Sequence, residues 1–208
     1  MARRRSPYER SVFLNVPFDV GYERNFIALI SSITSLGRTP HCVLELPELG
    51  SGRLSRLFEL LEQCRVSIHD LSRVNVPVRF NMPFELGLAC AFARYRKPHD
   101  YILVEKKPYR LDQTLSDLKG RDPLIHHGSP RQIISCVLDV LRSGSHNPDP
   151  IEVYKNSMEL WALAESLKRR YSITTIFSRS IFKELVIAGL ELAVEAEHIN
   201  KRRAVEFI

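Results

Sequence analysis

The fold is decided by the stretch SVFLNVPFDVGYERNFIALISSITSLG, residues 11–37. Its first six residues form a short apolar run, and the following PFDVG carries the proline and glycine of a turn. After the turn, Phe26, Ile30 and Ile33 recur at helical spacing until Gly37. The stretch therefore predicts a strand, a turn and a helix, in that order.

Apolar runs and helical patterns continue to alternate as far as residue 144. The further strands are expected at 41–46, 65–71, 100–107 and 123–127, and the further helices at 51–64, 83–95 and 130–144, with a short polar helix near 111–118. Right-handed crossovers between parallel strands place helices on both faces of a sheet. We therefore expect an α/β fold, a flavodoxin-like doubly wound five-stranded parallel sheet with a C-terminal helical extension.

Composition divides the chain of 208 residues into four segments. We expect a basic N-terminal tail at 1–10, the α/β domain at 11–144, a linker at 145–150, and a helical hairpin at 151–208. The linker falls in the run SGSHNPDP, residues 143–150, which is rich in Ser, Asn, Pro and Gly. The hairpin should consist of helices 151–171 and 178–199, the second with Ser178 as its N-cap.

The hairpin carries apolar residues that need a surface to pack against, among them Val153, Leu160, Trp161 and Leu185. That surface is either the α/β domain of the same chain or a second copy. We favour the second copy, a homo-oligomer through 151–208, because two appended helices offer a symmetric four-helix interface.

Charge and hydropathy exclude several classes of protein. No apolar run reaches the roughly 18 residues of a membrane span, and MARRR is followed by SPYER rather than a signal-like apolar segment. We expect a cytoplasmic protein with no membrane partner. The net charge of +6 comes largely from dispersed basic residues, and no zinc-finger, RNP-type or P-loop pattern accompanies them. A nucleic-acid partner therefore has no specific support.

Metal and disulfide chemistry have no sequence signal either. The four cysteines stand singly in apolar surroundings without a CxxC pair, which predicts buried thiols. The seven histidines show no paired-ligand spacing. We expect no metal and no cofactor.

Ligands of open parallel sheets bind beyond the carboxyl ends of the strands, near the point where the strand order reverses. This rule selects the segments 15–19, 45–52, 69–73 and 79–85. The polar residues gathered there are Asn15, Asp19, Asp70, Ser72, Arg79, Asn81 and Glu85.

Glu85 is the one acid in the largely apolar run NMPFELGLACAF, residues 81–92. One interpretation is structural: Asn81 or Met82 caps a helix, Pro83 fills its first turn, and an acid nearby favours the helix dipole. The other is functional: the eight residues after Glu85 carry no polar side chain, which predicts a helix buried nearly all round with a carboxylate at its open end. Such a carboxylate can stabilise positive charge or act as a nucleophile at a sugar carbon.

Four stretches together resemble the superfamily of nucleoside 2-deoxyribosyltransferases and bacterial TIR-like proteins, whose motif is of the NPFELG type. They are VFLNVPFD at 12–19, SIHDLSR at 67–73, RFNMPFELGLA at 79–89 and KPHDYILV at 97–104. The resemblance covers roughly residues 11–142. It implies a flavodoxin-like sheet and cleavage of N-glycosidic bonds in NAD or in deoxynucleosides.

The resemblance also implies roles for individual residues. Glu85 would be the catalytic carboxylate and Asp70 a second acid. The substrate-binding residues would be Asn15, Pro17, Phe18, Asp19, Ser72, Arg79 and Asn81. NAD would be a substrate rather than a cofactor, and the biological setting would be that of TIR-like effectors in antiviral defence.

Three functions stay open on the sequence. The first is an NAD glycohydrolase, an enzyme acting on NAD or a related nucleotide. The second is a nucleoside 2-deoxyribosyltransferase. The third is a non-catalytic module that binds a nucleotide or another protein.

Overall fold

The computed structural model describes residues 6–46, 52–73, 80–96, 98–118, 120–142 and 147–206. Its centre is a parallel sheet of five strands in the order β2-β1-β3-β4-β5, which confirms the predicted fold class. The strands are β1 (Ser11–Asn15), β2 (Thr39–Cys42), β3 (Val66–Asp70), β4 (Asp100–Glu105) and β5 (Leu124–Ile125). The order reverses at β1, so the crevice between the ends of β1 and β3 is where this topology places ligands.

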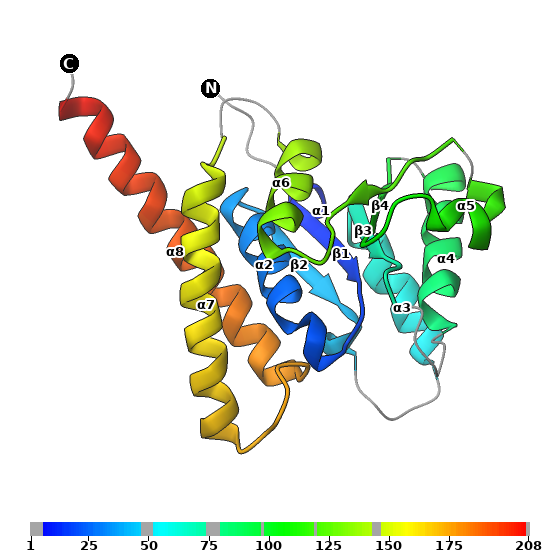
Figure 1. The fold of residues 1–208 in the computed structure, drawn as a ribbon, viewed down its shortest axis with the longest axis horizontal. Coiled ribbons are helices and arrows are strands. Elements are labelled where there is room, and N and C mark those ends of the chain that lie inside the picture. The colour runs from blue at the N-terminus through cyan, green and yellow to red at the C-terminus, as the bar shows by residue number, and fades with distance from the viewer. Residues whose placement is uncertain are drawn as a thin grey trace.

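Helices cover both faces of the sheet (Figure 1). One face carries α2 (Glu23–Ser35) and α6 (Pro130–Leu141), and the other carries α3 (Arg53–Glu62) and α4 (Asn81–Tyr95). The buried strand β1 serves both layers, since Val12 and Leu14 join the core under α2 while Phe13 joins the core under α3. The remaining short elements are α1 (Pro7–Arg10), η1 (Val20–Tyr22), η2 (Val43–Glu45), α5 (Arg110–Thr114) and η3 (Ser116–Leu118).

The C-terminal hairpin packs on the outer side of α2 (Figure 1). It consists of α7 (Pro150–Tyr171) and α8 (Arg179–Glu206), and Ser178 caps α8 as predicted by accepting the backbone N–H of Ile181. Val153, Leu160 and Leu185 are buried in the same core as β1 and α2. The apolar face of the hairpin therefore finds its surface within its own chain, and association of two copies stays a prediction.

Glu23, at the start of α2, fastens the turn between α7 and α8. Its carboxylate, 2% exposed, accepts a hydrogen bond from the Lys168 ammonium at 3.1 Å and another from the backbone N–H of Ile176 at 3.0 Å. Farther along, α8 approaches α2 so closely that a Cβ on Gly189 would lie 2.8 Å from Oγ1 of Thr34. The hairpin is thus an integral layer of the fold.

Two expectations about the elements were wrong. The second strand occupies Thr39–Cys42 rather than 41–46, because Glu45 accepts the backbone N–H of Cys42 and turns 43–45 into a 3-10 helix. The helix α4 is not buried nearly all round: it buries only the face that carries Met82, Glu85, Leu86 and Ala89. Its apolar residues on the other side remain in solvent, and Phe84 is 53% exposed.

The predicted N-terminal tail and the predicted linker both contain residues that belong to helices or cap them. Within the predicted tail, residues 7–10 form α1, closed by reciprocal hydrogen bonds between Ser6 and Glu9. The predicted linker ends at Asp149, whose side chain caps α7.

All four cysteines are free, with Cys42 and Cys64 buried and the other two half-buried. Among the described residues, no helix is both long and apolar enough to cross a membrane.

Candidate functional site

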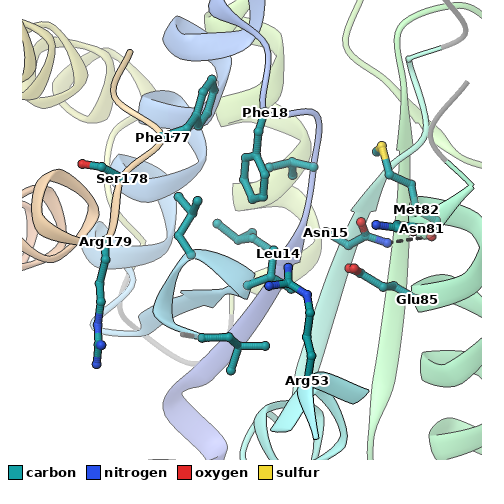
Figure 2. Close-up of a pocket in the computed structure, with 14 residues that line it drawn as sticks. Leu14, Asn15, Phe18, Arg53, Asn81, Met82, Glu85, Phe177, Ser178 and Arg179 are labelled. Atoms are coloured by element: carbon teal, nitrogen blue, oxygen red, sulfur yellow. Dashed lines mark hydrogen bonds between the residues drawn. The ribbon is translucent and has the colours of Figure 1, made fainter. Parts of the chain in front are cut away.

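A cavity of about 830 Å³ opens at the carboxyl end of β1, beside the point where the strand order reverses. This volume is typical of a pocket for a nucleotide-sized ligand. Its walls come from four parts of the chain: β1 and the loop after it, η2 with the start of α3, the start of α4, and the turn before α8 (Figure 2). The lining residues are Leu14, Asn15, Val16, Phe18, Val43, Leu44, Leu46, Arg53, Asn81, Met82, Glu85, Phe177, Ser178 and Arg179.

The Glu85 carboxylate points from α4 into this cavity (Figure 2). Glu85 is 9% exposed and has no hydrogen-bond partner within the described part of the chain. Burial raises the pKa of Glu85 to about 7, and the positive charge of Arg53 offsets part of that rise. The first turn of α4 contains no acid, so Glu85 lies too deep in the helix to serve as a dipole partner. A buried carboxylate without a protein partner, facing a cavity, is a candidate for chemistry.

A chain of buried hydrogen bonds runs under the cavity and ends at Asn15. The carbonyl oxygen of Cys64 lies 2.9 Å from Nδ1 of His99, whose Nε2 lies 3.0 Å from Oγ of Ser67. Oγ of Ser67 lies 2.9 Å from Nε2 of His69, and Nδ1 of His69 lies 3.0 Å from Nδ2 of Asn15. Burial lowers the pKa of His99, and it lowers the pKa of His69 to about 3, so both rings are neutral at pH 7.

The carbonyl of Cys64 fixes the direction of every hydrogen bond in this network. A carbonyl can only accept, so His99 carries its proton on Nδ1 and accepts at Nε2 from Ser67. Ser67 in turn accepts from Nε2–H of His69, which leaves Nδ1 of His69 bare to accept from Asn15. Asn15 Nδ2 gives its second hydrogen to the carbonyl of Met82 at 2.8 Å. Both amide hydrogens are used, and Oδ1 of Asn15 is left to accept a hydrogen bond from a ligand in the cavity.

Two phenylalanines line the cavity on the side of the hairpin. The Phe18 ring, after β1, lies 5.2 Å from the Phe177 ring, and Phe177 lies 5.4 Å from Phe26 of α2. This cluster holds the turn before α8 against the loop after β1. It also gives the cavity an apolar aromatic wall suited to a flat ring.

The structure brings four of the predicted site residues together: Asn15, Phe18, Asn81 and Glu85 all line the cavity. Pro17 and Asp19 lie elsewhere. Pro17 is buried but does not line the cavity, and Asp19 pairs with Arg73. The predicted ligand residue Arg79 lies outside the described residues.

Asp70 and Ser72 belong to a separate buried network. The Asp70 carboxylate is fully buried, accepts from Tyr22 Oη and from Ser72 N–H at 2.9 Å, and lies 3.1 Å from Nε2 of His126. Nδ1 of His126 accepts the N–H of Gly128, so Nε2 holds the proton and cannot act as a base toward Ser72. These residues brace the ends of the strands, and the structure gives Asp70 no exposure to the cavity.

Sequence reasoning did not assign the hairpin to the site. Phe177, Ser178 and Arg179 lie about 90 residues beyond Glu85 and follow no motif, so only packing could reveal them. In the described part of the chain, no group of three His, Cys, Asp or Glu side chains is arranged to hold a metal ion. Comparisons with protein-family models, with curated proteins and with solved structures found no match.

Proposed function

We propose that this protein cleaves the N-glycosidic bond of NAD or a related nucleotide, with Glu85 as the catalytic carboxylate. One observation carries the proposal: Glu85 is nine-tenths buried, has no partner in the described structure, and faces the cavity at the reversal point of the sheet. The resemblance of residues 79–89 to the NPFELG-type motif supports the same assignment.

The chemistry suits a carboxylate in this position. When the bond between the ribose carbon and the pyridinium nitrogen breaks, its electron pair goes to the nitrogen and nicotinamide leaves neutral. Positive charge develops on the sugar, and ionised Glu85 stabilises it until water adds to the carbon and loses a proton. Asn15 Oδ1 would accept from a ribose hydroxyl, and the ring of Phe18 or Phe177 would pack on a base.

The test is a product assay by chromatography, with NAD as substrate. The wild-type protein is expected to release nicotinamide. Glu85→Gln should lower the rate by at least about a hundredfold, because loss of one electrostatic stabiliser of a transition state commonly costs that much. Glu184→Gln, an exposed acid on α8, is the matched control and should keep full activity. Equal rates for Glu85→Gln and wild type would remove Glu85 from the chemistry.

The pH profile distinguishes this reaction from deoxyribosyl transfer. A neutral leaving group needs no acid, so NAD cleavage requires ionised Glu85 and its rate should rise as the pH passes about 7. The pKa of about 7 favours a second candidate as well, since a protonated Glu85 could donate to a departing purine of a deoxynucleoside. Base exchange that weakens above pH 7 would identify the transferase. Nucleotide binding without any product would identify a non-catalytic module.

A further inference from the structure

The cavity contains two arginines that form no ion pair within the described protein, although the charge of Arg53 acts on Glu85. Arg53 is the first residue of α3 and Arg179 the first residue of α8, and both line the cavity with exposed side chains. Neither forms an ion pair or a hydrogen bond within the described residues. Other arginines near this end of the sheet do have partners, as Arg73 has Asp19 and Arg110 has Glu105.

The charges of the cavity are arranged in order across it. Figure 2 shows Glu85 and Asn15 on one side, Arg179 on the opposite side, and Arg53 between them. Glu85 is the one acid among the lining residues, and it lies on the opposite side from Arg179, which also borders a neighbouring cavity lined by Glu45 and Glu59. The helices α3 and α8 begin at these same arginines and add the partial positive charge of their N-termini.

The two ends of the cavity suit different parts of one ligand. Glu85, nine-tenths buried and without a hydrogen-bond partner among the described residues, marks the end that would take a sugar carbon bearing positive charge. The arginine end suits an anion, because guanidinium groups bind phosphate oxygens through paired, charge-assisted hydrogen bonds. A neutral nucleoside would occupy the first end and leave both arginines without a partner.

We propose that Arg53 and Arg179 form an anion subsite that binds the phosphate groups of the substrate, so that the cavity selects nucleotides over nucleosides. This inference rests on the proposed function in one respect, the assignment of the Glu85 end of the cavity to a sugar. It also gives the hairpin a role in recognition, since Arg179 reaches the cavity only because α7 and α8 pack on α2.

The test is a binding titration by calorimetry, with ADP, inorganic pyrophosphate and adenosine as probes. We expect ADP to bind wild-type protein at least about tenfold more tightly than adenosine, as one or two charge-assisted hydrogen bonds provide. Arg53→Gln and Arg179→Gln should each weaken ADP binding about tenfold and leave adenosine binding unchanged. Pyrophosphate should compete with ADP in wild type and lose that competition in both variants.

Lys183→Gln is the matched control, because Lys183 is exposed one turn farther along α8 and does not line the cavity. It should bind ADP as wild type does. Equal affinities of wild type for ADP and adenosine would overturn the subsite, and so would a loss in Lys183→Gln as large as that in Arg179→Gln. Circular dichroism of each variant verifies that it is folded. Binding needs no turnover: phosphate preference without NAD cleavage would contradict the proposed function alone, and cleavage without the preference would contradict the subsite alone.

Discussion

The helices α2 and α4 cover opposite faces of one sheet, and their burial is the reverse of what their sequences indicate. α4 is a nearly unbroken apolar run, yet one face of it stays in solvent. α2 contains Ser31, Ser32, Thr34 and Ser35, yet every residue of it except Arg24 is buried. Burial here depends on what packs outside each helix, and that is decided more than 100 residues later in the chain, by α7 and α8.

The buried hydroxyl groups of Ser31, Ser32 and Thr34 in α2 are tolerated because each finds an acceptor. Ser32 donates to the carbonyl of Ala28 and Thr34 to that of Ile30, both within the helix. Ser31 donates to the carbonyl of Val153 on α7, at 2.9 Å. A small hydroxyl that bonds the backbone one turn earlier can be buried at little cost. The contrast separates two roles: α2 braces the molecule, and α4 presents the side chain of Glu85.

The largest effect on stability should come from removing the hydrogen bonds that Glu23 of α2 accepts from the hairpin. Glu23→Ala leaves the Ile176 N–H without its acceptor, beneath the turn that carries Phe177, while the Lys168 ammonium keeps its ion pair with Glu165 at 2.7 Å. Loss of a buried carboxylate that accepts from both an ammonium and a backbone N–H costs about 3 kcal/mol. Urea unfolding should show a loss of this size, while Glu184→Ala on the exposed side of α8 should change stability by less than about 0.5 kcal/mol. Similar stabilities for the two variants would mean that the hairpin is not held by Glu23.

On the α4 side, Glu85→Gln should increase stability while it removes activity. The pKa of Glu85 is raised from 4.5 to about 7, so the folded state holds a proton that the unfolded state has already released. Wild-type stability therefore falls as the pH rises between those values, by up to about 3 kcal/mol. The glutamine variant lacks this loss. Its stability advantage over wild type should be absent near pH 4 and greatest at pH 8, as thermal unfolding can measure. A constant difference across this range would contradict burial of the free carboxylate.

The comparison also shows what the sequence could reveal. Alternating apolar runs predicted the parallel sheet, and the topological rule placed Asn15 and Glu85 at one site, because both follow from local pattern and strand order. The hairpin's part in the cavity could not be predicted, since Arg179 carries no motif and its position depends on packing over α2. The position of Asp70 was also beyond reach, because its partners Tyr22 and His126 come from distant segments of the chain.

The chain of hydrogen bonds beneath α4 offers a smaller test. Ser67→Ala leaves Nε2–H of His69 without an acceptor and Nε2 of His99 without a donor. Loss of these two hydrogen bonds should lower the free energy of unfolding by about 2 kcal/mol. His69 would lose the acceptor that fixes its tautomer, and with it the fixed acceptor for the Asn15 amide, so turnover of NAD should fall further than the loss of stability explains. Ser135→Ala removes an exposed hydroxyl on α6 and is the control. If turnover in Ser67→Ala were unchanged, Asn15 would not depend on this chain for its orientation.

The smallest expected effect comes from replacing one glycine in α4, Gly87, and one in α8, Gly189, with alanine. A Cβ on Gly87 of α4 would meet nothing within 4 Å, whereas a Cβ on Gly189 of α8 would lie 2.8 Å from Oγ1 of Thr34. Alanine favours a helix over glycine by about 1 kcal/mol, so Gly87→Ala should stabilise the protein by that amount. Gly189→Ala gains the same preference but must displace Thr34, and its net effect should be a loss of about 1 kcal/mol.

A double-mutant cycle then separates the two contributions at Gly189. In a Thr34→Ala background the obstructing side-chain atoms are gone, and Gly189→Ala should become stabilising, as Gly87→Ala is in the wild type. A substitution that keeps the same sign in both backgrounds would show that α8 does not press on α2 at this point. A change of sign would show that α8 presses on α2 at Thr34, a contact that Gly87 of α4 has no counterpart for among the described residues.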